Sequence, residues 1–131
     1  MRAGPVIGPF SLTTDPALVE IMGWAGFDYV VLDMEHGPSS LQNLQDLVRA
    51  AEVAGIYPLV RTKEGNLAMI GEVLDAGAGG VVVPQVASAR LAEAAVRRAR
   101  FAPRATRPWT GSSTSRPRAR WWSCCRSTAR T

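Results

Sequence analysis

Three ionisable side chains fall within four residues, directly after a short apolar run. Asp33, Glu35 and His36 follow the run YVVL, which ends at Leu32. Charged groups at the end of a buried strand are costly unless they pair, bind a ligand or reach a cavity. The segment therefore predicts either an ion-pair network or a binding site.

Two further polar residues follow apolar runs, and each has a structural as well as a functional interpretation. Arg61 follows PLV, and Gln85 follows GVVV and a proline. Arg61 can be a salt-bridge partner of Asp33 or Glu35, and His36 can be a hydrogen-bonded loop histidine. On the residues alone, both interpretations stay open.

Asp75 stands near the end of a predicted helix, where a carboxylate opposes the helix dipole. Such a residue is expected to have a compensating partner. A hydrogen bond to His36 is one candidate.

The elements that must position these residues repeat along the chain. Three segments share the pattern apolar helix, Ala-Gly, apolar strand: residues 17–33, 46–62 and 69–85. The glycines are expected to end the helices in left-handed backbone. Asp15, Ser40 and Ser88 are the expected N-caps of three helices.

Apolar residues at helical spacing define the faces that are expected to enter the core. They are Leu18, Ile21, Met22 and Ala25; Leu41, Leu44, Val48 and Ala51; Leu67, Ile70 and Leu74; and Leu91, Ala95, Val96 and Ala99. The strands, with residues 5–12 as the first, are short apolar runs typical of a parallel sheet.

The resulting order βαβαβαβα predicts an α/β fold made of the first four βα units of a TIM (β/α)8 barrel. A whole barrel typically needs ~250 residues, so residues 1–103 are expected to form a truncated, N-terminal half. The alternative is a small, open, doubly wound sheet. The first strand is not followed by a glycine-rich phosphate loop, which weakens that alternative.

The amino-acid composition also changes near residue 100, close to the end of the expected half-barrel. The 131 residues are 47% hydrophobic, enough for a core, and carry a net charge of +4. Residues 1–100 hold eight basic and eleven acidic residues, whereas residues 101–131 hold seven arginines and no acid. No apolar run approaches a membrane span and no signal-peptide core is visible, so we expect a soluble, cytoplasmic protein.

Residues 104–131 form a basic tail of a different character. The tail lacks Leu, Ile, Val and Met, so it supplies no core strand, and the adjacent Cys124 and Cys125 suit neither a disulfide framework nor a metal site. One interpretation is a nucleic-acid-binding arm with Trp109, Trp121 and Trp122 as stacking platforms.

The genetic code favours another interpretation of the tail. Residues 120–126, RWWSCCR, translated from the third base of the first codon with serine as AGY, give Leu/Met/Val-Val-Glu-Leu-Leu-Pro/Ser. A polar segment thereby becomes apolar. We interpret residues 104–131 as frameshifted and disordered.

Four segments together carry a family resemblance. GPFSLTTDP, GFDYVVLDMEHGPSS, PLVRT and LDAGAGGVVVPQV resemble the HpcH/HpaI aldolases, which are class II pyruvate aldolases. The resemblance implies a (β/α)8 barrel, usually oligomeric, that joins pyruvate reversibly to an aldehyde. It also implies a divalent cation: Mg²⁺, Mn²⁺ or Co²⁺.

The resemblance also implies roles for three residues. His36 matches the histidine of the catalytic dyad, Asp75 the aspartate that orients it, and Arg61 the substrate-binding arginine beside the pyruvate oxygens. The family's metal ligands follow later strands, so no metal ligand is expected in this chain, which is then an inactive fragment of an aldolase. Two other functions stay open: a non-catalytic half-barrel binding module with a nucleic-acid arm, and a small hydro-lyase or phosphate-binding protein.

Overall fold

A four-stranded parallel sheet forms the centre of the computed structural model, which describes residues 4–101. Its strands are β1 (Phe10–Ser11), β2 (Tyr29–Asp33), β3 (Tyr57–Arg61) and β4 (Gly80–Val82). They lie side by side in chain order, β1-β2-β3-β4. A doubly wound sheet reverses its order at a switch point. The sequential order therefore confirms the predicted four βα units and excludes that alternative.

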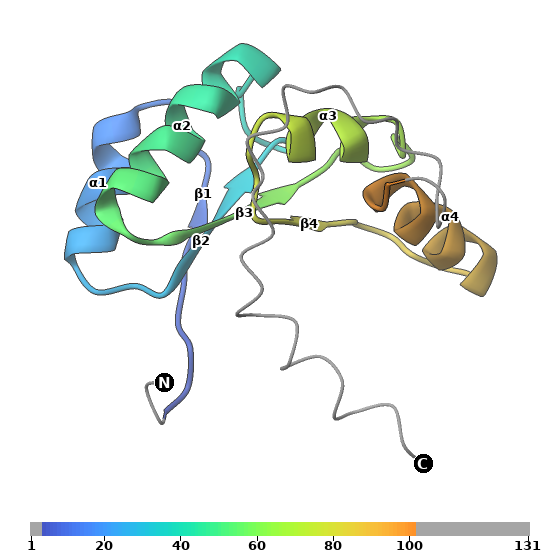
Figure 1. The fold of residues 1–131 in the computed structure, drawn as a ribbon, viewed down its shortest axis with the longest axis horizontal. Coiled ribbons are helices and arrows are strands. Elements are labelled where there is room, and N and C mark those ends of the chain that lie inside the picture. The colour runs from blue at the N-terminus through green and yellow to red at the C-terminus, as the bar shows by residue number, and fades with distance from the viewer. Residues whose placement is uncertain (1–3, 102–131) are drawn as a thin grey trace.

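Four helices alternate with the strands: α1 (Pro16–Trp24), α2 (Leu41–Ala54), α3 (Met69–Asp75) and α4 (Ala89–Ala99). Helices α1, α2 and α3 lie on the same side of the sheet (Figure 1). This is the result expected for right-handed crossovers between neighbouring strands.

The expected helix caps are present. The side chains of Asp15, Ser40 and Ser88 accept hydrogen bonds from the first-turn amides of α1, α2 and α4. Gly55 ends α2 in the left-handed region, with φ of 73°. These local signals fix where three of the helices begin and where α2 ends.

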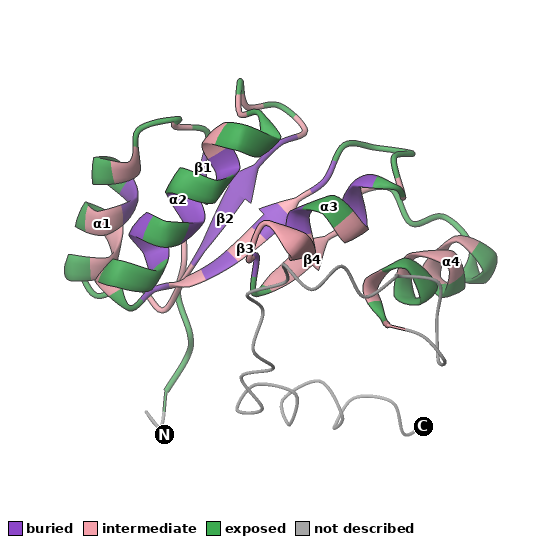
Figure 2. Ribbon diagram, turned by 45° about the horizontal axis from the view of Figure 1, so that its top comes forward, coloured by how far each residue is buried: buried purple, intermediate pink, exposed green. Residues whose placement is uncertain are grey.

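The core lies between the sheet and α2. Val30 and Leu32 of β2 and Val60 of β3 are buried against Leu44 and Leu47 of α2. Figure 2 shows this buried layer along β2, β3 and the inner side of α2. Side chains alternate along a strand, so Val31 and Asp33 of β2 point to the opposite face of the sheet.

Two expectations about the first βα unit are wrong. The first strand is confined to Phe10–Ser11 instead of spanning residues 5–12. In α1, Val19 is buried, whereas Leu18 and Ile21 of the expected core face are exposed. Gly23 lets α1 approach α2 closely, so the Val19 side of the helix meets the core. Of the expected face, Met22 packs against the core, whereas Leu18 and Ile21 face outward.

Helix α4, which follows β4, packs only partly against the rest of the structure. No residue of α4 is fully buried, although the helix is amphipathic. Within residues 4–101, no helix has the length and apolar character to cross a membrane. The domain boundary at residue 103 and the interpretations of residues 104–131 lie outside the described part of the chain.

Candidate functional site

The candidate site lies at the carboxyl ends of β2 and β3. The strand register pairs Asp33 with Arg61, and Arg61 with Val82 of β4. Parallel strands end at the same edge of a sheet, which is where α/β proteins bind their ligands. Two residues 28 positions apart in sequence thereby become neighbours at that edge.

Asp33 and Arg61 form a two-pronged ion pair. The Arg61 Nε donates to Asp33 Oδ1 at 2.9 Å, and Nη2 donates to Oδ2 at 2.5 Å. The side chain of Asp33 is only 2% exposed, and that of Arg61 is 23% exposed. Two parallel hydrogen bonds between a guanidinium and a carboxylate fix the orientation of the guanidinium plane and add to the electrostatic attraction. The guanidinium is therefore held in one position before any ligand arrives.

The loop after β2 also holds Asp33. The backbone N–H groups of Glu35 and His36 donate to Asp33 Oδ1, with distances of 2.9 and 3.3 Å. Gly37 closes this turn, and a Cβ atom there would lie 2.2 Å from the Asp33 carbonyl oxygen. The turn thus needs glycine, and it bends the Glu35–His36 segment back over the strand end.

The pKa values of the pair shift in the directions that these contacts require. The hydrogen bond from Arg61 lowers the pKa of Asp33 to about 2, and the two backbone donors act in the same direction against the effect of burial. The hydrogen bond to Asp33 in turn raises the pKa of Arg61 above its ordinary value. Both groups are charged at neutral pH.

Arg61 has two more neighbours. Glu35 Oε2 lies 3.3 Å from the Arg61 Nε. The Arg61 guanidinium carbon lies 5.1 Å from the centroid of the ring of Phe10, the first residue of β1. Nη1 makes no hydrogen bond with residues 4–101, so it is the Arg61 group available to a ligand oxygen.

His36 lies beside this cluster and faces solvent. Its side chain is 68% exposed, and its Nε2 lies 3.8 Å from Glu35 Oε2. An exposed imidazole next to a fixed guanidinium can reach a substrate bound at the sheet edge. Glu35 is a neighbour of both His36 and Arg61, so the three residues lie in one cluster, and the roles expected for His36 and Arg61 stay predictions.

Asp75 is at the other end of the sheet. It is the last residue of α3, and the turn that follows leads to the start of β4, where the Gly79 N–H donates to the carbonyl of Pro58, near the start of the neighbouring strand β3, at 2.8 Å. His36 instead follows the carboxyl end of β2. The length of β3 separates the two residues, on the order of 13 Å at the usual rise per residue. Within one chain, Asp75 does not meet His36.

One neighbour of Arg61, Phe10, was not expected from sequence. Phe10 is separated from Arg61 by two βα units, and only the strand register places it beside the guanidinium. Gln85 has a φ of 53°, which is unusual for a residue other than glycine. The sequence analysis singles out Gln85 because it follows an apolar run, whereas no such signal marks Phe10.

The described residues do not fit a metal ion. From Gly4 to Phe101, no group of three or more His, Cys, Asp or Glu residues could hold one. Arg61 and backbone amides already engage Asp33, and Arg61 also engages Glu35. The cluster is thus a guanidinium fixed by two carboxylates, whose oxygens are already engaged.

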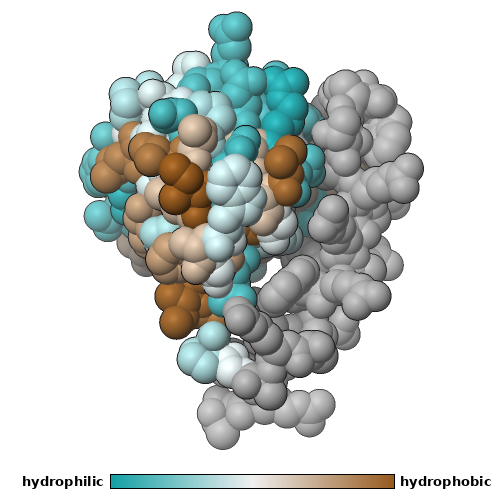
Figure 3. Space-filling model, turned by 90° about the vertical axis from the view of Figure 1, so that its left-hand side faces the viewer, coloured by the Kyte–Doolittle hydropathy of each residue, from teal (hydrophilic) through white to brown (hydrophobic). Residues whose placement is uncertain are grey.

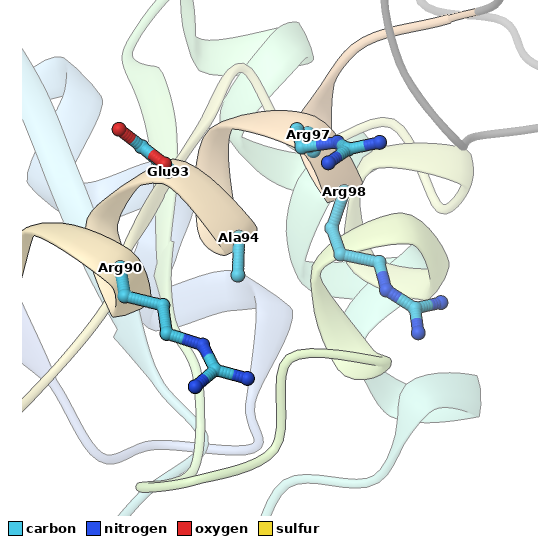
Figure 4. A pocket seen from close by; sticks show the side chains of 5 residues that line it. All are labelled: Arg90, Glu93, Ala94, Arg97 and Arg98. Atoms are coloured by element: carbon cyan, nitrogen blue, oxygen red, sulfur yellow. The ribbon is translucent and has the colours of Figure 1, made fainter.

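A shallow pocket lies on the surface of α4. Arg90, Glu93, Ala94, Arg97 and Arg98 line it (Figure 4). All five belong to one helix, and none lies at a strand end. The pocket is therefore separate from the candidate site.

Comparisons with curated proteins find aldolases. The chain is 32% identical over 106 residues to 2-dehydro-3,6-dideoxy-6-sulfogluconate aldolase of Pseudomonas putida, covering 81% of this chain and 42% of that protein. It is 40% identical over 103 residues to hydroxypyruvate/pyruvate aldolase of Agrobacterium fabrum, covering 79% and 39%. The chain thus spans less than half the length of these relatives.

Solved structures agree with the fold. The citrate synthase SbnG superposes with a TM-score of 0.76 at 37% identity, covering 81% of this chain and 43% of that one. An HpcH/HpaI aldolase from Desulfitobacterium hafniense superposes with a TM-score of 0.75 at 35% identity, covering 82% and 42%. The model of the HpcH/HpaI aldolase/citrate lyase family matches residues 7–117 of this chain. The motifs, the parallel βα units and these likenesses agree, and the chain belongs to the HpcH/HpaI aldolase/citrate lyase family.

Proposed function

We propose that this chain carries the 2-oxo-acid-binding part of a metal-dependent aldolase that cleaves or forms 4-hydroxy-2-oxo acids through a pyruvate enolate. One observation carries the proposal. Asp33 and Glu35 hold the Arg61 guanidinium at the carboxyl edge of the sheet and leave its Nη1 available. The aldolases among its relatives support the same reaction class.

Arg61 is the group that stabilises negative charge. Removal of a methyl proton from pyruvate places charge on the former keto oxygen, and a cation already fixed beside that oxygen needs no reorganisation. The Asp33 carboxylate prevents the guanidinium from turning away, since it binds the other side of the fork. Arg61 thus binds the substrate oxygens and favours the enolate.

His36 is the group that moves a proton. Its exposed imidazole can accept or return a proton at solvent-facing positions of the substrate. Asp75 cannot orient it from within the same chain. The proposed orienting role of Asp75 therefore requires a second copy of the polypeptide.

A divalent cation such as Mg²⁺, Mn²⁺ or Co²⁺ supplies polarisation of the keto oxygen when it is bound. The described residues do not fit such an ion, so its ligands belong to elements beyond β4 in the proposed whole enzyme. The 131-residue chain by itself is then an inactive fragment.

A chimera tests the proposal. Residues 1–103 replace the matching segment of the Agrobacterium fabrum hydroxypyruvate/pyruvate aldolase, and exchange of the pyruvate methyl protons with deuterium is followed by NMR. We expect metal-dependent exchange in the folded chimera. Arg61→Ala is expected to slow it about 10²- to 10³-fold, which is the usual cost of losing an oxyanion partner.

Other variants of the chimera separate the roles. His36→Ala is expected to slow exchange while leaving pyruvate binding largely intact, because a proton relay acts in the transition state. Asp75→Asn is expected to act in the same direction by less. Arg49→Ala, on the exposed side of α2, serves as the matched control and keeps full exchange. A folded chimera with full exchange after Arg61→Ala would contradict the proposal.

A further inference from the structure

Phe10 contacts Arg61 through the face of its ring. The Arg61 guanidinium carbon lies over this ring, 5.1 Å from its centroid. A guanidinium within about 6 Å of an aromatic ring is attracted by the negative charge at the centre of the ring face. Asp33 and Glu35 contact the nitrogen atoms of Arg61, so Phe10 supplies a contact of a different kind.

The strand register explains how Phe10 reaches Arg61. Phe10 of β1 pairs with Val31 of β2, and Arg61 of β3 pairs with Asp33 of β2. Val31 and Asp33 are two positions apart, so these side chains project from the same face of the sheet. Strand β2 lies between β1 and β3, which are therefore about 10 Å apart. Asp33 on the middle strand draws the guanidinium across β2, and the guanidinium thereby comes to lie over the Phe10 ring.

The hydrogen bonds to Asp33 leave one motion of Arg61 open. They hold one edge of the guanidinium, through Nε and Nη2. The group can still tilt about the line that joins these two bonds, because carboxylate oxygens accept hydrogen bonds over a broad range of directions. Glu35 Oε2 lies beside Nε, on the same edge. A ring against the face of the guanidinium restrains this tilt, which the contacts at the edge do not.

We propose that Phe10 is a positioning residue, whose ring holds the plane of the Arg61 guanidinium so that Nη1 meets a bound 2-oxo acid from one fixed direction. The inference rests on the function proposed above for Arg61. A cation stabilises a developing enolate most when it is fixed in place before the charge appears. Phe10 thus acts on the enolate through Arg61 and does not need to touch the substrate.

A purely apolar role is the alternative for Phe10. Figure 3 shows hydrophobic side chains gathered on the side of the molecule that carries α1 and β1. Ile7 and Leu12, close to Phe10 in sequence, are also among the exposed hydrophobic residues. The contact with Arg61, and not exposure, distinguishes Phe10 from these residues. An apolar role needs only an apolar side chain of similar size, whereas a cation–π contact needs the ring, so substitution separates the two roles.

The first experiment measures the contact in the full 131-residue chain. Hydrogen exchange of the Arg61 Nε–H, followed by NMR, reports how often the guanidinium leaves its carboxylate partners. Phe10→Leu removes the ring and is expected to speed this exchange about 3- to 30-fold, which is the range of a cation–π contact. Phe10→Tyr and Phe10→Trp keep a ring and are expected to exchange like the parent chain. Phe27→Leu, the same change just before β2, is the matched control and leaves the exchange unchanged.

A graded series of phenylalanine analogues at position 10 separates the charge of the ring face from its shape. Each added ring fluorine weakens the negative charge of the face and changes the shape of the ring little. The logarithm of the Arg61 Nε–H exchange rate is therefore expected to rise steadily with the number of fluorines. Equal exchange across the series, or a Phe10→Leu variant that exchanges like the parent chain, would overturn the proposal.

The second experiment measures the effect on the proposed chemistry, as exchange of the pyruvate methyl protons in the aldolase chimera at saturating pyruvate. Phe10→Leu is expected to slow this exchange about 3- to 30-fold, and to have no further effect in the Arg61→Ala background, because Phe10 acts through Arg61. An equal effect in both backgrounds would mean that Phe10 acts as an apolar surface or touches the substrate, and would refute the positioning role. A folded chimera without any exchange would contradict the function proposed for the chain, whereas the Arg61 Nε–H measurement would still decide whether Phe10 positions Arg61.

Discussion

Asp33 has two roles at the candidate site. Its carboxylate binds the Arg61 fork, and the same carboxylate accepts the backbone N–H groups that shape the loop carrying His36. One side chain thereby fixes both proposed functional residues. Loss of the Asp33 charge is expensive, because the part-buried guanidinium would lose its two-pronged partner and keep only Glu35 nearby.

Asp33→Asn is accordingly expected to destabilise the fold by about 2–4 kcal/mol. The measurement is urea unfolding followed by circular dichroism. Asp46→Asn is the matched control, since Asp46 pairs with Arg49 on the exposed side of α2 and such a pair contributes at most about 1 kcal/mol. Equal effects of the two substitutions would show that the buried pair contributes no special stability.

The low pKa of Asp33 predicts a pH dependence of stability. A carboxylate whose folded-state pKa is about 2 contributes stability above its unfolded-state value of ~3.9 and loses it as the pH falls through the folded-state value. The difference in unfolding free energy between the parent chain and Asp33→Asn should therefore shrink between pH 5 and pH 2.5. A difference that stays constant over this range would mean that Asp33 does not titrate in the predicted way.

At the scale of the elements, the contact between α1 and α2 decides which side of α1 is buried. Gly23 lies against Ala54, and a Cβ atom at Gly23 would come within 2.5 Å of the Ala54 Cβ. The close approach buries Val19 and turns Leu18 and Ile21 outward. Which side of α1 is exposed thus depends on a glycine on its inner side.

Gly23→Ala is expected to destabilise the fold by about 1–3 kcal/mol, because the added methyl group forces the two helices apart. Gly71→Ala in α3 is the matched control, since a Cβ atom there meets nothing within 4 Å. That substitution should be neutral or stabilise by up to about 1 kcal/mol through helix propensity. Thermal unfolding of both variants compares them, and a Gly23→Ala variant as stable as Gly71→Ala would argue against close helix packing.

At the scale of the whole molecule, residues 4–101 contain the proposed substrate-binding cluster and no group of three candidate metal ligands. We expect the 131-residue chain with pyruvate and Mg²⁺ or Mn²⁺ to show no metal-dependent exchange of the methyl protons, measured by NMR. The reason is that residues 4–101 present no group of three metal-binding side chains. Exchange by the chain alone would mean that groups present here, with Asp33 and Glu35 first, hold the metal.

Much of the fold follows from local patterns in the sequence. The caps at Asp15, Ser40 and Ser88 and the left-handed Gly55 are short-range interactions, so their positions are readable from neighbouring residues. The continuous apolar strands predict parallel pairing, and the residues that follow them identify the carboxyl edge of the sheet, where the candidate site lies. The clustering of Asp33 with Arg61 follows from that edge.

Only the tertiary structure decides which side of an element is covered and which strand ends coincide. Leu18 and Ile21 have core-like spacing, yet the approach at Gly23 turns them outward. Phe10 reaches Arg61 through strand register, and the βα topology places Asp75 at the opposite end of the sheet. The physical reason is that periodicity along one chain segment reports amphipathicity, whereas packing partners and register arise from contacts between segments far apart in sequence.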